Sequence, residues 1–259
     1  MKNDVVLSTL CDGAHEICLN RPERMNALGV QTVKDLLAAV EQCVMRKSRV
    51  LLLRAQGVAF CAGADLKERK SMDLAERLQH NAGINAVNDA IAAAPMVSLA
   101  VIQGLAFGGG LEMALACDLR LAACGIQLGL TESRVGAFPG AGGIQRLTRA
   151  IGTPRALHMM LTGEPVSSEH ALSMGLVNEV HPADHLQQRA LELTQWLASR
   201  SALGQSTLRR LAYEGREMPI DQALRMDRQA LPDILGSADY AEGLAAFEER
   251  RTPRFNSIH

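Results

Sequence analysis

The longest uncharged stretch of the chain, from Ala90 to Leu111, constrains the fold most strongly. It is long enough to cross a membrane as one helix. However, Pro95, Gly104 and the three consecutive glycines at 108–110 would break a lone helix, because proline removes a backbone donor and glycine adds conformational freedom. We therefore interpret the stretch as the end of one helix, a buried strand, a glycine loop and the start of another helix.

Apolar periodicity in the rest of the chain alternates between strand-like and helical spacing, and after about Leu186 only helical spacing remains. This order is typical of an α/β core with a helical appendage. We predict a core with the active site over 1–198 and a helical oligomerisation region over 199–259. The expected strands are 5–9, 15–19, 50–53, 96–102, 119–122, 126–130 and 177–180, the expected helices are 30–47, 73–93, 111–117 and one near Gln145, and 57–65 and 104–110 are expected as loops.

Composition limits the kinds of partner. The 259 residues are 47% apolar and 21% charged, as in soluble domains with a sizeable core. The 27 basic and 28 acidic residues give a net charge of −1, and only 3% of residues are aromatic. Such a chain has no global attraction for nucleic acid or an anionic membrane, and no aromatic platform for bases. We therefore expect neither a nucleic-acid nor a membrane partner.

The cysteines contain no CxxC pair and lie mostly in apolar runs, which predicts buried, reduced thiols and a reducing compartment. The N-terminal residues show neither a signal-peptide apolar stretch nor a transit segment. We expect a cytoplasmic protein of bacterial type, with a mature organellar form as the open alternative. The cysteines are Cys11, Cys18, Cys43, Cys61, Cys117 and Cys124.

Several catalytic motifs are absent from the sequence: the GxxxxGK[ST] phosphate loop, the GxSxG nucleophile elbow, a GxGxxG after a strand, and HExxH. His181 and His185 are four residues apart, as metal ligands on a helix can be. Pro182 follows the first of them and no third ligand is evident. We interpret this pair as the solvated start of a helix and expect no metal site.

The run Gly108-Gly109-Gly110-Leu111-Glu112 carries the most chemistry. Three glycines allow a ligand to approach the backbone, and the first N–H groups of the following helix suit an oxyanion or a phosphate. The glycines alone favour a tight packing turn. Glu112 changes that balance, because a carboxylate on an otherwise apolar helix is rarely buried unless it is paired or functional. A glutamate that only complements the helix dipole is the alternative.

Two further segments are candidates for the same site as this run. Glu132 follows the apolar run 126–130, and by its neighbours alone it is best interpreted as a surface-loop glutamate. Facing one substrate, two carboxylates divide the labour, one activating a water and the other handling a proton at carbon. Residues 60–67 are mostly small, so an N–H there and one at Gly109 could form an oxyanion hole. An ordinary strand-to-helix turn is equally consistent with 60–67.

Together these segments resemble the enoyl-CoA hydratase/isomerase (crotonase) superfamily over nearly the whole chain. The resemblance implies an α/β fold of the ClpP/crotonase type, a spiral of ββα units with roughly perpendicular sheets, and a C-terminal helical region that builds a homotrimer, often paired into a hexamer. The matching segments are Asn26-Ala27-Leu28, Ala62-Gly63-Ala64-Asp65-Leu66-Lys67, 104–112, Cys117-Asp118, 139–143 and Gln145-Arg146-Leu147.

The resemblance also implies roles for single residues. The backbone N–H groups of Ala64 and Gly109 would form the oxyanion hole for the enolate of a coenzyme A thioester. Glu112 would orient and activate water, and Glu132 would hold that water and handle the proton at Cα. Coenzyme A would be part of the substrate, with no separate cofactor. The residues expected to bind substrate or coenzyme A are Asn26, Ala27, Leu28, Ala62, Ala64, Asp65, Leu66, Lys67 and Gly108.

Two glutamates favour the syn hydration of a trans-2-enoyl-CoA in the β-oxidation of fatty acids or in amino-acid catabolism. The sequence looks most like the branch that holds methylglutaconyl-CoA hydratase, so that activity and enoyl-CoA isomerisation are the alternatives. A non-enzymatic RNA-binding or scaffold trimer is disfavoured by both glutamates and by the few basic residues over 30–47. Thr131, Ile144 and Val97 depart from the common pattern, which leaves acyl specificity open.

Overall fold

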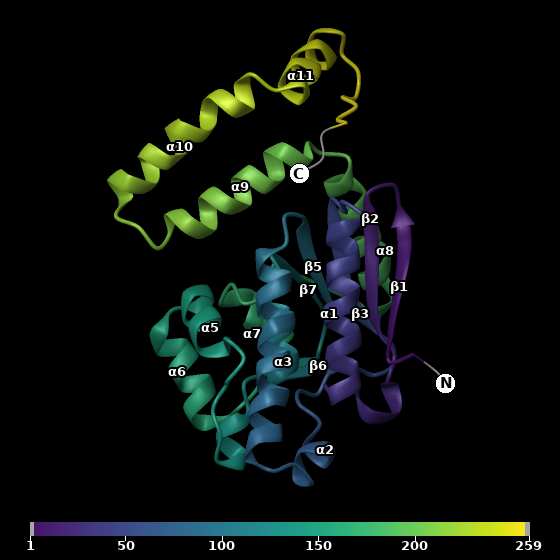
Figure 1. Cartoon of the computed structure of the whole chain (residues 1–259), viewed down its shortest axis with the longest axis vertical. Helices are drawn as coiled ribbons and strands as arrows, with labels where there is room; N and C mark the ends of the chain where they lie inside the picture. Colours follow the sequence, from purple (N-terminus) through teal and green to yellow (C-terminus); the bar gives the residue numbers. More distant parts are fainter. Residues whose placement is uncertain (1–2, 257–259) are drawn as a thin grey trace.

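The computed structural model describes residues 3–256, which form two sheets flanked by helices (Figure 1). The larger sheet has six strands in the order β1-β2-β3-β5-β7-β10, and the smaller has four in the order β4-β6-β8-β9. The larger sheet contains β1 (Val5–Cys11), β2 (Ala14–Leu19), β3 (Val50–Ala55), β5 (Val97–Ile102), β7 (Leu119–Ala123) and β10 (Glu179–His181), and the smaller contains β4 (Ala59–Cys61), β6 (Leu105–Phe107), β8 (Gln127–Gly129) and β9 (Val166–Ser167).

The chain alternates between the two sheets. β3, β5 and β7 pair in parallel in the larger sheet, and the strand after each of them, β4, β6 and β8, pairs in parallel in the smaller one. A helix then leads towards the next pair of strands, as expected for a spiral of ββα units. The helices are α1 (Val30–Met45), α2 (Leu66–Lys70), α3 (Leu74–Ala93), α4 (Gly109–Ala116), α5 (Gly143–Ile151), α6 (Thr153–Thr162), α7 (Ser168–Ser173), α8 (Ala183–Ala198), α9 (Ala202–Gly215), α10 (Ile220–Leu235) and α11 (Ala238–Glu248), with 3₁₀ turns η1 (Pro22–Arg24) and η2 (Glu132–Val135).

The uncharged stretch forms the end of α3, then β5, β6 and the first turn of α4. All residues of β5 and α4 are buried, which explains why the stretch carries no charge. Within residues 3–256, no helix combines the length and the apolar character needed to span a bilayer. The expected loop over 104–110 is partly wrong, because Leu105–Phe107 is a strand. A strand of three residues between glycines shows no measurable periodicity.

Other short elements also escaped the sequence patterns. β4 lies within the expected loop over 57–65, and the last strand is Glu179–His181 instead of 177–180. The helices α2, α6 and α7 were not expected. Four cysteines are buried and Cys11 is half-buried, but the expectation of burial is wrong for Cys124, which is exposed; all six are free thiols.

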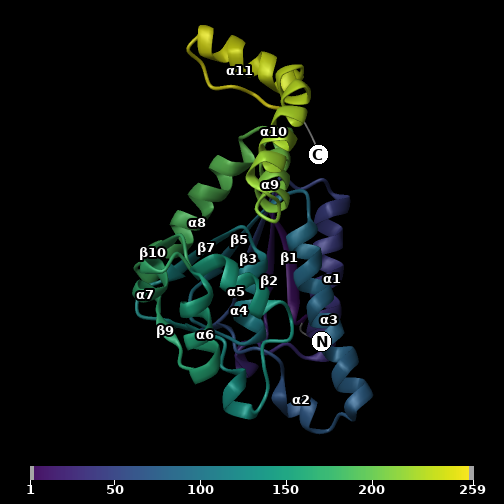
Figure 2. The same cartoon turned by 90° about the vertical axis from the view of Figure 1, so that its left-hand side faces the viewer.

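The helices α9, α10 and α11 lie at one end of the two-sheet core, and α10 and α11 extend away from it (Figures 1 and 2). The expected boundary between 198 and 199 falls between α8, which packs on the larger sheet, and α9. Large apolar side chains on these last helices are exposed, among them Ile220 at 73% and Phe247 at 85%. The oligomerisation expected of this region stays a prediction.

Asp118, which follows α4, attaches α9 to the core. Its carboxylate accepts hydrogen bonds from Arg209 Nε at 2.7 Å, from Tyr213 Oη at 3.0 Å and from the backbone N–H of Ser98 at 2.7 Å. Arg209 is only 11% exposed and also donates to the carbonyl of Ala94. Most of the carboxylate's lone pairs are therefore satisfied at the junction between the core and the C-terminal helices.

Asp118→Ala is expected to lower the free energy of unfolding by about 3 kcal/mol, because removing one partner leaves the charge of Arg209 buried and unpaired. Urea denaturation followed by circular dichroism measures the change. The control is Asp221→Ala, which removes an exposed pair with Arg225 and is expected to change stability by less than about 0.5 kcal/mol. Equal effects of the two substitutions would contradict the role given to Asp118.

Candidate active site

Three neighbouring parallel strands of the smaller sheet bring the predicted site together. β4 pairs with β6 and β6 pairs with β8, so their carboxyl ends meet at one edge of the sheet. Ala64 follows β4, Gly109 follows β6 and Glu132 follows β8. A Cβ atom at Gly109 would lie 3.6 Å from the nitrogen of Ala64, which places the two backbone groups side by side.

The N–H groups of Ala64 and Gly109 are available to a ligand. Leu28 bridges this loop by donating to the carbonyl of Gly63 at 2.8 Å and accepting from the N–H of Asp65 at 3.0 Å. The N–H of Gly109 is the first of α4 and has no partner within that helix. Across residues 3–256, neither N–H donates to a protein acceptor. Two adjacent unpaired donors at a helix N-terminus can stabilise a developing oxyanion.

Glycine is required where this corner is tightest. Gly63 and Gly108 have φ values of +94° and +49°, in the region that other residues rarely adopt. A Cβ atom at Gly63 would lie 2.9 Å from the carbonyl oxygen of Phe107. A side chain at Gly110 would meet the Cβ of Cys61 at 2.7 Å. The triple glycine therefore permits both the packing of α4 on β4 and the approach of a ligand.

Glu112 is buried on the first turn of α4, with 3% of its surface exposed. One carboxylate oxygen, Oε1, accepts hydrogen bonds from the N–H groups of Ala141 at 2.8 Å and Gly143 at 2.9 Å. Burial raises the pKa of Glu112, and these two bonds oppose that rise by favouring the ionised form. The expected burial of Glu112 is confirmed. The glycine turn at 139–143 supplies its donors.

Glu132 starts the 3₁₀ turn η2, and its carboxylate faces the triple glycine. Oε1 lies 3.0 Å from where a Cβ atom of Gly108 would be, and Oε2 is buried without a hydrogen-bond partner in residues 3–256. Burial, reinforced by the like charge of Glu112, raises the pKa of Glu132 to about 7. Glu132 is therefore half-buried in an otherwise exposed turn, and the interpretation as a surface-loop glutamate is only partly right. A carboxyl group with this pKa can hold or release a proton near neutral pH.

The other predicted site residues divide into buried supports and exposed groups. The Asn26 amide is buried and fully engaged, accepting from the N–H of Arg21 and donating to two carbonyls. Asp65 caps α2 and pairs with Arg24 at 2.9 Å, and although burial opposes ionisation, these bonds hold its pKa below the usual range. Both side chains shape the loop that carries Ala64. Among the remaining predicted residues, Ala27 and Leu28 are buried and Ala62 is half-buried. Leu66 and Lys67 are exposed beside the loop. The contacts of all these residues with coenzyme A stay predictions.

Sequence reasoning missed the polar face of α3, which joins the two halves of the site. His80 Nε2 forms a hydrogen bond with the carbonyl of Leu28 at 2.9 Å, on the oxyanion side of the site, where the N–H groups of Ala64 and Gly109 lie. Asn81 and Asn85 donate to the carbonyl of Gly140, and Asn88 donates to that of Ala141, on the side that holds Glu112. Four polar residues on one side of a helix that the core covers were the available signal.

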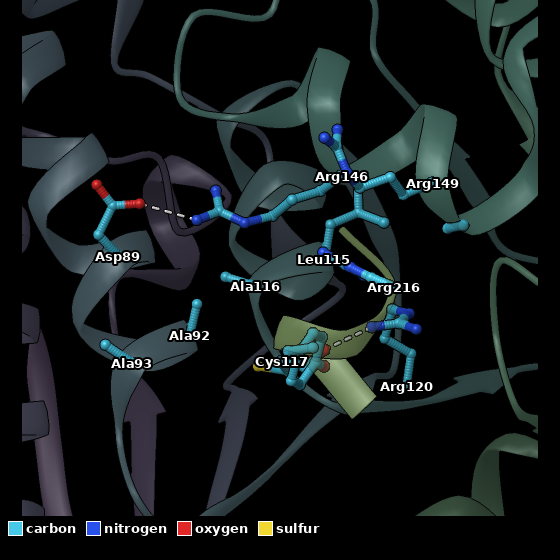
Figure 3. A pocket seen from close by; sticks show the side chains of 12 residues that line it. Asp89, Ala92, Ala93, Leu115, Ala116, Cys117, Arg120, Arg146, Arg149 and Arg216 are labelled. Atoms are coloured by element: carbon cyan, nitrogen blue, oxygen red, sulfur yellow. Dashed lines mark hydrogen bonds and ion pairs between the residues drawn. The ribbon is translucent and has the colours of Figure 1, made fainter. Parts of the chain in front are cut away.

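A cavity of about 550 Å³ opens at the C-terminal end of α4, away from the two glutamates (Figure 3). Its arginines are engaged with protein groups: Arg146 pairs with Asp89 at 2.8 Å, and Arg120 donates to the carbonyl of Cys117 at 2.6 Å. Burial raises the pKa of the Cys117 thiol to about 12, so the thiol stays protonated. The cavity lacks both glutamates and the oxyanion corner. In the part of the chain that the structure describes, no group of three or more His, Cys, Asp or Glu side chains is placed to hold a metal ion.

Comparison with known proteins identifies the class to which this fold and site belong. The model of the enoyl-CoA hydratase/isomerase family matches residues 11–258. The chain is 40% identical to human mitochondrial enoyl-CoA hydratase domain-containing protein 2 over 94% of its length and 85% of that protein. It is 34% identical to mouse mitochondrial methylglutaconyl-CoA hydratase, over 92% of this chain and 77% of that one.

The solved structures agree. An enoyl-CoA hydratase from Bacillus anthracis superposes with a TM-score of 0.95 at 35% identity, covering 97% of this chain and 98% of the other. The chain therefore belongs to the enoyl-CoA hydratase/isomerase family, and it has the crotonase fold. The two relatives named above are mitochondrial proteins. The cytoplasmic location expected for this chain stays a prediction.

Gly110→Ala is expected to destabilise the protein by at least about 3 kcal/mol, because the added methyl group clashes with Cys61 where α4 packs on β4. Thermal unfolding and the yield of soluble protein measure this. Gly204→Ala is the control, since its methyl group would meet only Ser201 at ordinary contact distance, 3.4 Å, at the start of α9. It should be neutral or slightly stabilising. A Gly110→Ala protein as stable as the control would show that the packing is not tight.

Proposed function

We propose that this protein catalyses the reversible hydration of a trans-2-enoyl-CoA to a 3-hydroxyacyl-CoA. The observation that carries the proposal is the convergence of two carboxylates, the buried Glu112 and the half-buried Glu132, on one corner with two backbone donors that have no partner in residues 3–256. Hydration needs an acid, a base and a site for negative charge, and this corner offers all three. The fit of the whole chain to the enoyl-CoA hydratase/isomerase family supports the same reaction class.

The backbone donors act on the thioester. The thioester oxygen accepts hydrogen bonds from the N–H groups of Ala64 and Gly109. As water adds at Cβ, negative charge moves onto this oxygen and an enolate develops. Fixed donors stabilise that charge without reorganising during the reaction, and a single such donor is worth roughly 10²–10³ in rate. The first turn of α4 adds its dipole in the same direction.

The two carboxylates share one proton. Glu112, whose ionised form is favoured by two backbone N–H groups against the effect of burial, accepts a proton from water as the water oxygen attacks Cβ. Glu132, protonated below its pKa of about 7, delivers its proton to Cα on the same face. After the addition, Glu112 holds the proton and Glu132 is ionised. The pair therefore carries one proton in both directions of the reaction.

Hydration of methylglutaconyl-CoA is an alternative activity, and similarity to one relative supports it. Methylglutaconyl-CoA hydratase is 34% identical to this chain over most of its length, and its name describes the same chemistry on a branched substrate. Isomerisation of an enoyl-CoA needs only the proton transfer at carbon and is the other alternative. A role in β-oxidation and assembly as a trimer or hexamer belong to the same proposal.

Glu112→Gln and Glu132→Gln are each expected to lower kcat for crotonyl-CoA hydration by about 10³-fold, because each removes one acid–base group. Loss of the enoyl absorbance measures turnover. Butanoyl-CoA, which cannot react, should bind both variants within about threefold of wild type, since the oxyanion corner is intact.

The control for these variants is Glu41→Gln, an exposed glutamate on α1 that lies outside the site; it should retain wild-type turnover. Wild-type turnover by either active-site variant would refute the two-carboxylate mechanism. Assays with crotonyl-CoA, methylglutaconyl-CoA and a 3-enoyl-CoA on one preparation distinguish the proposed hydration from the two alternatives.

The pH dependence of kcat/KM should be bell-shaped, because only the singly protonated pair is active. The upper limb should lie near pH 7, where the pKa of Glu132 lies, so hydration declines as pH rises through that value. Dehydration of the 3-hydroxyacyl-CoA should show the same limbs. Initial rates between pH 4.5 and about pH 9 test this. In Glu132→Gln the residual rate should lose the upper limb; a limb that persists unchanged would exclude Glu132 as its origin.

A further inference from the structure

Arg69, at the last turn of α2, is a half-buried cation between the two halves of the site. Its Nε–H donates to His80 Nδ1 at 3.1 Å, and its guanidinium also contacts Asn81 Oδ1 at 3.4 Å. In residues 3–256 it forms no ion pair with a carboxylate. Arg21, Arg24 and Arg54, which are similarly half-buried, each pair with a carboxylate. Arg69 is instead fixed by neutral groups.

The tautomer and the charge of His80 follow from its two hydrogen-bond partners and its burial. Its Nε2 lies 2.9 Å from the carbonyl of Leu28, so Nε2 carries the hydrogen and Nδ1 accepts from Arg69. Burial, with the nearby charge of Arg69, lowers the pKa of His80, so the ring is neutral at physiological pH. A neutral imidazole therefore fixes the guanidinium without cancelling its charge, and it ties Arg69 to the segment that bridges Ala64.

Asn81, which contacts the guanidinium of Arg69, donates to the carbonyl of Gly140 in the turn that holds Glu112. The charge of Arg69 therefore lies within the site, where it acts on both glutamates. It opposes the rise in the pKa of Glu112 and likewise that of Glu132. The converse also holds, since both carboxylates favour the charged form of Arg69. Among the described residues, Arg146 is the other cation that acts on Glu112, and it is paired with Asp89.

The remaining charged groups around Arg69 have other partners. Arg77, on α3, donates to the carbonyl of Arg69 and repels its charge. Glu68, beside it on α2, pairs with Arg21 at 3.2 Å. Asp65 pairs with Arg21 and Arg24. Arg69 is therefore the one cation in the described part of the chain that acts on both Glu112 and Glu132.

We propose that Arg69 is a positioning residue of this active site: held by His80 and Asn81, it is the fixed cation that offsets the repulsion between Glu112 and Glu132 and limits the pair to one proton. The proposal rests on the proposed function. Without that cation, Glu112 and Glu132, whose charges repel each other, would take up the second proton at a higher pH. With two protons on the pair, no base remains to activate water.

Arg69→Met, which keeps the length but removes the charge, should therefore move both limbs of the pH profile of kcat/KM to higher pH by about one unit. Arg69→Lys, which keeps the charge, should restore both limbs to within about half a unit. The control is Lys70→Met, which removes an exposed cation from the same helix and should leave both limbs within about 0.3 units. Crotonyl-CoA hydration between pH 4.5 and about pH 9 provides the profiles.

A rate loss in Arg69→Met without movement of the limbs would overturn the proposal, because it would indicate a structural role alone. An equal movement in Lys70→Met would also overturn it, because any nearby cation would then be sufficient. If Arg69→Met does not fold, as judged by circular dichroism, Arg69→Gln takes its place, since it is uncharged but keeps an N–H donor for His80.

A measurement that does not depend on turnover tests the role of Arg69 independently of the proposed hydration reaction. In protein labelled with ¹³C at the glutamate carboxyl carbons, the Glu132 signal is the one that Glu132→Gln removes. Its titration midpoint should rise by about one pH unit in Arg69→Met and stay in place in Lys70→Met. If the wild-type protein does not hydrate enoyl-CoA but Arg69→Met shows this rise, the proposed function is refuted and the role of Arg69 is supported. An active hydratase without the rise would do the reverse.

Discussion

The site depends on the parallel pairing of β4, β6 and β8. Each of these strands is only three residues long, and each ends at the same edge of the smaller sheet. The pairing brings Ala64, Gly109 and Glu132 together from segments far apart in the sequence. Without this register, the two backbone donors and the second carboxylate would not face one substrate. The close packing of Gly110 against Cys61 maintains it.

Burial of charge is the second constraint. Glu112 is buried, Glu132 and Arg69 are half-buried, and the charge of each is compensated differently. Glu112 receives two backbone N–H groups, Arg69 receives neutral side chains, and Glu132 Oε2 receives no partner among the described residues. The less compensated of the two carboxylates, Glu132, has a pKa raised to about 7, as expected when desolvation dominates. In the proposed mechanism, this difference in environment gives two chemically identical side chains different roles.

The helix α3 is the common support. Its polar face bonds carbonyls on both the oxyanion side and the side that holds Glu112, while Ile84, Val87 and Ile91 bury the apolar face in the core. A capping box of Asp73 and Glu76 fixes its N-terminus close to α2. A mechanical link of this kind lets the fold hold the two halves of the site in one geometry, which preorganised catalysis requires.

The longer elements and the chemically distinctive residues could be predicted from the sequence. Helical spacing predicted α1, a helical stretch was expected for α3, and short apolar runs predicted the strands of the larger sheet. The glycines with Glu112 indicated a buried carboxylate beside free backbone donors, because a carboxylate on an apolar helix is rarely buried unless it is paired or functional. The rest required the tertiary structure. β4 and β6 are too short for periodicity, and the partial burial of Glu132 depends on distant residues. The support from Arg69 and His80 comes from contacts between separate helices, and such contacts leave no local pattern in the sequence.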